Sequence, residues 1–151
     1  AAEKGNPNAQ LNLGHLYDQG LGVNQDHTEA AKWYRSAALQ GVQLAMLNLA
    51  SLYFEGVGVE QNDVEAFNWY EKAALAGNPT AQYNLSVMYE EGIGTNPDPV
   101  AAMAWLNLAA DNGVIVTDDE RDQLRNSLSA SQTRDATALF EELKDSIPAA
   151  E

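Results

Sequence analysis

Apolar residues recur along the chain with the period of an amphipathic α-helix, in segments separated by short glycine-containing turns. The first segment predicts a helix from about Ala9 to Gln19. Its apolar face is expected to consist of Ala9, Leu13, Leu16 and Tyr17. A Gly-x-Gly turn ends this segment, because glycine readily adopts the left-handed backbone conformation that such a helix end requires.

A second helix is expected after each of these turns. In the first case Asp26 has the side chain of an N-cap, and Ala30, Trp33 and Ala37 follow it along the helix. This helix is expected to end at Gly41 as its C-cap glycine. The unit of the chain is therefore a pair of helices.

The pair is repeated three times with a period of 36 residues. The columns that recur at this step include Asn12/Asn48/Asn84, Tyr17/Tyr53/Tyr89, Gly20/Gly56/Gly92, Trp33/Trp69/Trp105 and Gly41/Gly77/Gly113. One helix pair cannot bury its apolar face alone, so neighbouring pairs must stack. The pattern predicts an all-α fold, a superhelical α/α solenoid of stacked antiparallel helix pairs.

The repeated pattern is A-x-x-N-L-x-x-(L/M)-Y-x-x-G-x-G, followed by A-x-x-W-(Y/L)-x-x-A-A-x-x-G. It resembles the Sel-one-like repeat (SLR) family, a relative of the tetratricopeptide repeat with a slightly longer unit. The resemblance covers Ala9 to about Gly113 and implies a TPR-like helical solenoid. It says much more about the fold than about the function.

A single solenoid domain is expected. Its parts are the tail of an upstream repeat at 1–8, repeats at 9–44, 45–80 and 81–116, and C-terminal capping helices at 117–151. The first part is inferred from Ala2 and Gly5, which stand 36 residues before Ala38 and Gly41. A longer protein with at least one more repeat upstream would explain them, and a vestigial N-terminal extension is the alternative.

The second helix of the third repeat, residues 100–110, is apolar on almost every face and must be covered on every face. Two helices downstream are expected to cover it, each opened by a capping box. The boxes and the approximate helix ends are Thr117/Glu120 to Leu128 and Ser129/Gln132 to Asp145. This arrangement resembles the cap of bacterial SLR proteins and implies a bacterial source.

The negative charge of the chain excludes nucleic acids as partners. Eight Lys and Arg residues oppose 22 Asp and Glu residues, and the formal net charge of −14 repels nucleic-acid phosphates. No apolar run reaches the roughly 18 residues of a membrane span, so membrane insertion is not expected. The chain has no cysteine, which excludes disulfides and thiolate chemistry.

Candidate chemistry is sparse. His15 and His27 can approach each other across the first turn with Asp18 and Asp26 beside them, but a metal site needs three or four converging ligands. The Gly-x-Gly turns lack the lysine of a phosphate-binding loop, and no G-x-S-x-G motif occurs. We therefore expect no catalytic residue, no metal, no cofactor and no enzymatic activity.

The first helix of each pair lines the concave side of such a solenoid, so its outer positions are the candidate partner contacts. These predicted binding residues are Asn12, His15, Asp18, Leu47, Asn48, Phe54, Tyr83, Asn84 and Glu90. The asparagine column either presents amides to a peptide backbone or ties each repeat to the next. Phe54, with Leu47 and Tyr83, either forms an apolar floor for a partner or packs against the adjacent repeat. The acidic residues form either a rim that attracts Lys or Arg or a solvated face; they are Asp18, Glu55, Glu90 and Glu91.

These patterns favour a scaffold or adaptor that binds a protein or peptide carrying basic residues in the concave groove. Two alternatives stay open, namely self-association as a homodimer through the N-terminal repeat, and hydrolysis of a cell-wall-like substrate. Analogy with bacterial SLR proteins implies a periplasmic or secreted location, with a cytoplasmic one as the alternative.

Overall fold

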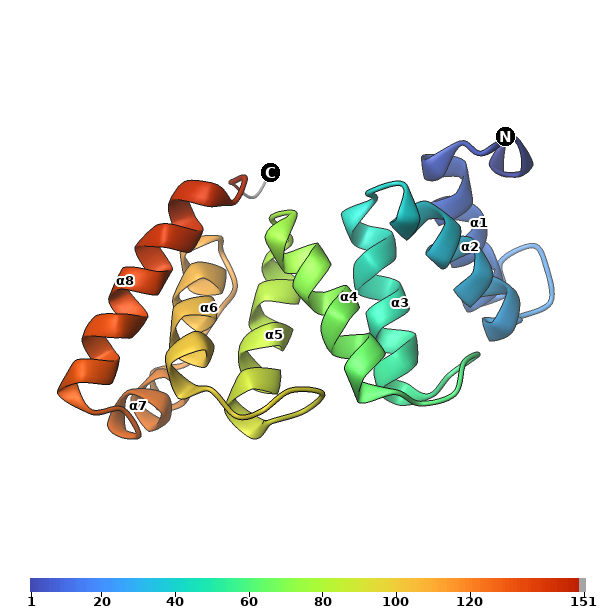
Figure 1. The fold of residues 1–151 in the computed structure, drawn as a ribbon. Coiled ribbons are helices and arrows are strands. Elements are labelled where there is room, and N and C mark those ends of the chain that lie inside the picture. Colours follow the sequence, from blue (N-terminus) through green and yellow to red (C-terminus); the bar gives the residue numbers. More distant parts are fainter. Residues whose placement is uncertain (150–151) are drawn as a thin grey trace. The chain divides into compact units, whose positions relative to one another are not determined.

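The computed structural model describes residues 1–149, which form only helices and turns (Figure 1). The elements are the 3-10 helix η1 (Ala2–Lys4) and the α-helices α1 (Pro7–Gln19), α2 (His27–Leu39), α3 (Gln43–Glu55), α4 (Asp63–Leu75), α5 (Pro79–Glu91), α6 (Pro99–Asp111), α7 (Asp118–Asn126) and α8 (Ala130–Ser146). The prediction of an all-α fold is confirmed. Within residues 1–149, no helix is both long enough and apolar enough to cross a lipid bilayer.

The chain forms two compact units, Ala1–Lys72 and Ala73–Glu151, called here the N-terminal unit and the C-terminal unit. The boundary between them falls inside α4. The N-terminal unit contains η1, α1, α2, α3 and most of α4. The C-terminal unit contains the end of α4 and the helices α5 to α8.

Side-chain caps fix where the helices begin. The Asp26 carboxylate accepts a hydrogen bond from the Glu29 backbone N–H at 3.1 Å, which confirms Asp26 as the N-cap of α2. Asn6 caps α1 in the same way, and Pro7 stands at the first helical position. For this reason α1 begins two residues earlier than the apolar pattern predicted.

The predicted C-cap of α2 is wrong by one residue. The helix ends at Leu39, and the C-cap is Gln40, whose backbone N–H donates to the Ala37 carbonyl in a tightened last turn. Gly41 follows with φ +88°, so it adopts the left-handed backbone conformation directly after the cap.

The buried face of α1 also differs from the predicted one. The buried residues of this helix are Gln10 and Gly14, whereas Leu16 is 37% exposed. Gly14 lies against the Tyr34 ring, and a Cβ at this position would stand 2.7 Å from the Tyr34 Cδ1 atom. The helices α1 and α2 meet at a small residue rather than at the large apolar ones. The same column holds Ala50 and Ser86, which are 0% and 3% exposed.

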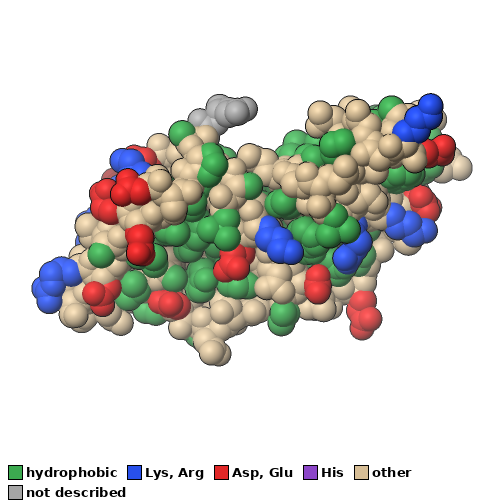
Figure 2. Space-filling view, turned by 45° about the horizontal axis from the view of Figure 1, so that its top comes forward, with side chains coloured by type: hydrophobic (Ala, Val, Ile, Leu, Met, Phe, Trp, Pro, Cys, Tyr) green, Lys and Arg blue, Asp and Glu red, His purple; other side chains and the backbone are tan. Residues whose placement is uncertain are grey.

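In the C-terminal unit, α6 is buried on almost every face, as its sequence predicted. Both capping boxes are present, at Thr117 with Glu120 and at Ser129 with Gln132. The helices α7 and α8 cover α6 through a core cluster of Ala102, Met103, Leu106, Leu124 and Ala136. Figure 2 shows Asp and Glu side chains over α8 at the left of the view, with some Lys and Arg side chains among them.

A buried glutamine connects three segments of the C-terminal unit. The Gln82 amide donates to the Ala74 carbonyl oxygen at 3.2 Å and accepts from the Asn112 amide at 3.0 Å. In the N-terminal unit Gln10, two repeats earlier, donates to the Ala2 carbonyl oxygen at 3.2 Å. Repeat 2 has Met46 at this position, so the column is not uniform and the sequence comparison did not single it out.

Replacing Gln82 with methionine is expected to lower the free energy of unfolding by about 1–2 kcal/mol, because the Ala74 carbonyl and the Asn112 amide lose their buried partner. Methionine is close to glutamine in volume and stands at the same position in repeat 2, so packing should change little. Urea unfolding would measure the loss. Gln123→Met on the exposed face of α7 is the matched control, and an equal loss in both variants would contradict the prediction.

Candidate functional site

A pocket of about 410 Å³ opens in the N-terminal unit between the end of α1, the start of α2 and the face of α3. The residues that line it are Asp18, Gln19, His27, Asn48, Ser51, Leu52, Glu55 and Val57. Two of the predicted binding residues, Asp18 and Asn48, therefore meet in one pocket. They come from successive repeats, and their meeting depends on how α1 and α3 pack.

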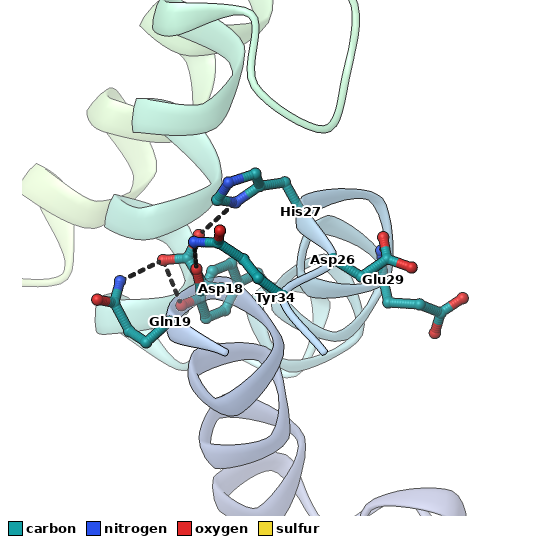
Figure 3. Close-up of polar contacts among 7 residues, drawn as sticks. Asp18, Gln19, Asp26, His27, Glu29 and Tyr34 are labelled. Carbon is teal, nitrogen blue, oxygen red and sulfur yellow. Dashed lines mark hydrogen bonds and ion pairs between the residues drawn. The ribbon is translucent and has the colours of Figure 1, made fainter. Parts of the chain in front are cut away.

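The Asp18 carboxylate is held in place by three neighbours. His27 Nδ1 lies 3.0 Å from Asp18 Oδ1, and Gln19 Nε2 donates to Asp18 Oδ2 at 3.2 Å. The Tyr34 hydroxyl donates to the same Oδ2 atom at 3.4 Å. Figure 3 shows these side chains directed toward Asp18. The side chains of Asp26 and Glu29 point away from this cluster (Figure 3).

The Tyr34 hydroxyl connects the first two repeats. Burial raises the pKa of Tyr34 well above its ordinary value, and the negative charge of Asp18 raises it further. The hydroxyl therefore stays protonated and can donate to Asp18. The Asn48 side chain, from repeat 2, acts on the same hydroxyl and opposes the shift in its pKa.

The pocket carries two carboxylates that have no Lys or Arg partner among the described residues. Within residues 1–149, neither Asp18 nor Glu55 forms an ion pair with a Lys or an Arg. The Ser51 hydroxyl lies 3.0 Å from the Tyr70 hydroxyl. Burial raises the pKa of Tyr70, the Ser51 hydrogen bond lowers it, and the charge of Glu55 raises it again. The negative charge of Glu55 therefore acts on the Tyr70 hydroxyl.

The other predicted residues of the N-terminal unit lie outside this pocket. Asn12 and His15 are exposed on α1, and Leu47 is half-buried on α3. Phe54 is 42% exposed on α3, next to Glu55. Among the described residues, no three or more His, Asp or Glu side chains come together as metal ligands.

The remaining predicted residues lie on α5 in the C-terminal unit. Tyr83 packs against the core cluster of the cap, and its hydroxyl donates to Glu120 Oε1 at 2.5 Å. The hydrogen bond to Glu120 is the main reason why the pKa of Tyr83 is raised, with a smaller effect from the charge of Glu90. Asn84 is half-buried and Glu90 is exposed. The structure thus gives Tyr83 a contact with the cap.

The Tyr83–Glu120 contact predicts a pH dependence of stability. The hydrogen bond from Tyr83, followed by those from Thr117, lowers the pKa of Glu120 below its ordinary value of 4.5. A lowered pKa in the folded state stabilises the fold above the unfolded-state pKa, and the contribution is lost as the pH falls through the folded-state pKa. The difference in the free energy of unfolding between wild type and Glu120→Gln should therefore shrink as the pH falls from 7 to 3.

Chemical denaturation at several pH values would measure this difference. In a Tyr83→Phe background, which removes the main cause of the shift, the same comparison should depend less on pH. A pH dependence of equal size in both backgrounds would contradict the assignment.

Sequence reasoning missed three residues that line the pocket, namely Gln19, Leu52 and Val57. Ser51 lies at an outer position of the first helix of repeat 2, and Glu55 belongs to the predicted acidic rim. A usable signal was present, because Asn48, Leu52 and Glu55 stand at positions i, i+4 and i+7 and share one helical face.

Comparison with known proteins gives a family match over most of the chain. The sequence model of the Sel1 repeat matches three successive segments, residues 7–42, 43–78 and 79–114. Each has the 36-residue length of the period found in the sequence. No curated protein matches the chain.

Two solved structures resemble the chain along most of its length. One is a Sel1 repeat protein from Oxalobacter formigenes, with 38% sequence identity and a TM-score of 0.71, covering 83% of this chain and 92% of that one. The other is a protective antigen present in uropathogenic Escherichia coli strains that displays an SLR fold, with 28% identity and a TM-score of 0.77. It covers 97% of this chain, which spans only 39% of the antigen. The predicted family resemblance and the helical-repeat solenoid class are thereby confirmed.

Proposed function

The chain belongs to the Sel1 repeat family, whose members are generally helical-repeat scaffolds for protein interaction, and we propose that it binds a partner protein on the exposed faces of α1 and α3. The observation that carries this proposal is the pocket between these helices together with the exposed aromatic residue Phe54, which precedes the pocket residue Glu55 in α3. A pocket supplies the concave surface that holds a side chain, and an aromatic residue supplies the type of contact that dominates binding energy.

Phe54 is not required by the repeat itself. The equivalent positions in repeats 1 and 3 hold Asp18 and Glu90, so the fold accepts polar side chains there. Phe54 is 42% exposed, and Leu44 on the same helix is 46% exposed. Burying such apolar surface against a partner is favourable, at about 25 cal/mol per Å². These residues support the assignment of α3 as a contact helix.

The pocket is better suited to binding than to hydrolysis. Sel1 repeats form a non-catalytic helical-repeat fold. The pair Asp18 and His27 resembles part of a catalytic triad, but the Ser51 hydroxyl is hydrogen-bonded to Tyr70 rather than to His27. A nucleophile without a base in contact is not activated. The polar side chains of the pocket therefore serve better as hydrogen-bonding groups for a ligand.

The test is affinity capture from a lysate of the source organism with wild type, Phe54→Ala and Leu39→Ala. Leu39 is 70% exposed on α2 and is the matched control for loss of surface apolar area. We expect a protein that is captured by wild type and by Leu39→Ala, but about tenfold less by Phe54→Ala, as for a hot-spot residue. Capture that does not differ between the two variants, or no specific capture by wild type, would contradict the proposal.

A further inference from the structure

We infer that the pocket lined by Asp18 and Glu55 accepts a Lys or Arg side chain of the bound partner, an assignment that rests on the proposed function. The pocket is lined by residues of two repeats and contains two carboxylates that pair with no Lys or Arg among the described residues. A cationic side chain is the protein group that complements this charge.

The pocket has unused hydrogen-bond acceptors, so it matches a ligand group that carries donors and no acceptors. A carboxylate offers about four acceptor positions, and the structure uses three of those on Asp18, through His27, Gln19 and Tyr34. The Glu55 carboxylate accepts no hydrogen bond from the described residues. Ammonium and guanidinium groups carry only donors, so they fit these unused acceptors, whereas a carboxylate or a phosphate does not.

The apolar part of the pocket fits the stem of the same side chain. Leu52 and Val57 line the pocket together with the polar groups. Lys and Arg place their methylene stems along apolar surface while the charged head reaches polar groups. The volume of about 410 Å³ leaves room for one such side chain and water.

The second repeat lacks counterparts of Asp18 and His27, the pair that repeat 1 contributes to this pocket. Phe54 and Asp63 occupy the positions equivalent to Asp18 and His27, so the carboxylate and the imidazole that hold each other in repeat 1 have no counterpart there. The third repeat has Glu90 and Pro99 at these positions. The pairing of a carboxylate with a histidine therefore occurs once in the three repeats, and a partner would place one basic side chain at a defined position.

The test is an NMR titration of the ¹⁵N-labelled full chain with three small probes at low salt. The probes are N-acetyl-arginine amide, N-acetyl-lysine amide and N-acetyl-citrulline amide, the last being the neutral analogue of arginine. We expect the two cationic probes to shift the backbone amides of Asp18, Asn48 and Glu55, and the citrulline probe to shift none of them. Shifts of equal size with citrulline, or cation shifts spread evenly over the acidic helices α7 and α8, would overturn the assignment.

Two variants test which carboxylate matters. Glu55→Gln is expected to lower the affinity for the cationic probes about tenfold, since a charge-assisted hydrogen bond is lost. Glu91→Gln is the matched control, because Glu91 stands at the same position of repeat 3, and it should change the affinity by less than about twofold. Both residues are exposed, so the substitutions should leave the fold intact. Equal effects in the two variants would overturn the assignment.

The two proposals fail in distinguishable ways. If Phe54→Ala abolishes partner capture while the cationic probes do not bind at the pocket, the scaffold function holds and the basic-residue assignment is wrong. If the cationic probes bind at the pocket but wild type captures no specific partner, or Phe54→Ala captures it as well as Leu39→Ala does, the pocket chemistry is correct and the proposed function is wrong.

Discussion

Replacing Gly58 with alanine is expected to lower the free energy of unfolding by about 3 kcal/mol, from left-handed backbone strain and a steric clash together. Gly58 has φ +72°, and a Cβ built on it would lie 2.2 Å from the His27 carbonyl oxygen. That oxygen belongs to the backbone at the start of α2, so no side-chain rotation can relieve the clash. The turn between α3 and α4 would have to move away from α2.

Gly22→Ala separates the two contributions. Gly22 stands at the same position one repeat earlier, has φ +76°, and a Cβ there would meet no atom within 4 Å. In this variant the free energy of unfolding should fall by about 1 kcal/mol, from backbone strain alone. The entropy that alanine removes from the unfolded chain is common to both variants and cancels in the comparison. Urea unfolding of the two proteins measures the difference, and equal losses would show that the contact with His27 is not close.

The second large effect is expected in the cap. Replacing Leu124 with alanine should lower the free energy of unfolding by about 3 kcal/mol, through lost apolar burial and the cavity left behind. Leu124 of α7 is 2% exposed and belongs to the same core cluster as Met103 and Leu106 of α6. Because α6 is apolar on almost every face, loosening of α7 and α8 would expose apolar surface of α6 to water.

Ile115→Ala is the control for this prediction. Ile115 lies in the segment before α7 and is 91% exposed, so its truncation should change the free energy of unfolding by less than about 0.5 kcal/mol. Guanidinium unfolding followed by circular dichroism measures both variants. If Leu124→Ala were as mild as Ile115→Ala, the cap would not be a cooperative part of the fold.

Sequence reasoning was most successful where a local rule decides the structure. The N-cap at Asp26 and the capping boxes at Thr117 and Ser129 are formed by residues within three positions of one another. The need for a cap on α6 followed from its own composition. Each of these features depends on one short segment and on nothing far away in the chain.

The sequence was less informative about which face of a helix makes close contact. On α1 the apolar pattern pointed to Leu13 and Leu16, but the closest approach occurs at Gly14, where the Tyr34 ring needs space. A search for large apolar residues cannot find a contact that depends on a missing side chain. The column of small residues at 36-residue spacing was the available signal.

The candidate site shows the same limit. Phe54 was predicted as part of an apolar floor, yet the pocket is lined by its neighbour Glu55 from the predicted acidic rim, because one step along a helix turns the side chain by about 100°. Tyr83 was predicted as a partner contact, and the structure pairs it with Glu120, which is 37 residues away in the chain. Both outcomes depend on how separate helices pack, which a periodic pattern does not specify.

The way the repeats begin has a consequence for engineering. Repeats 1 and 3 start with an asparagine cap, at Asn6 and Asn78, and place a glutamine four residues later, at Gln10 and Gln82. Repeat 2 starts at Val42, which makes no side-chain cap. The two kinds of junction alternate, so the module for lengthening the chain is a block of two repeats, 72 residues long. Inserting a single repeat would place two junctions of the same kind in succession.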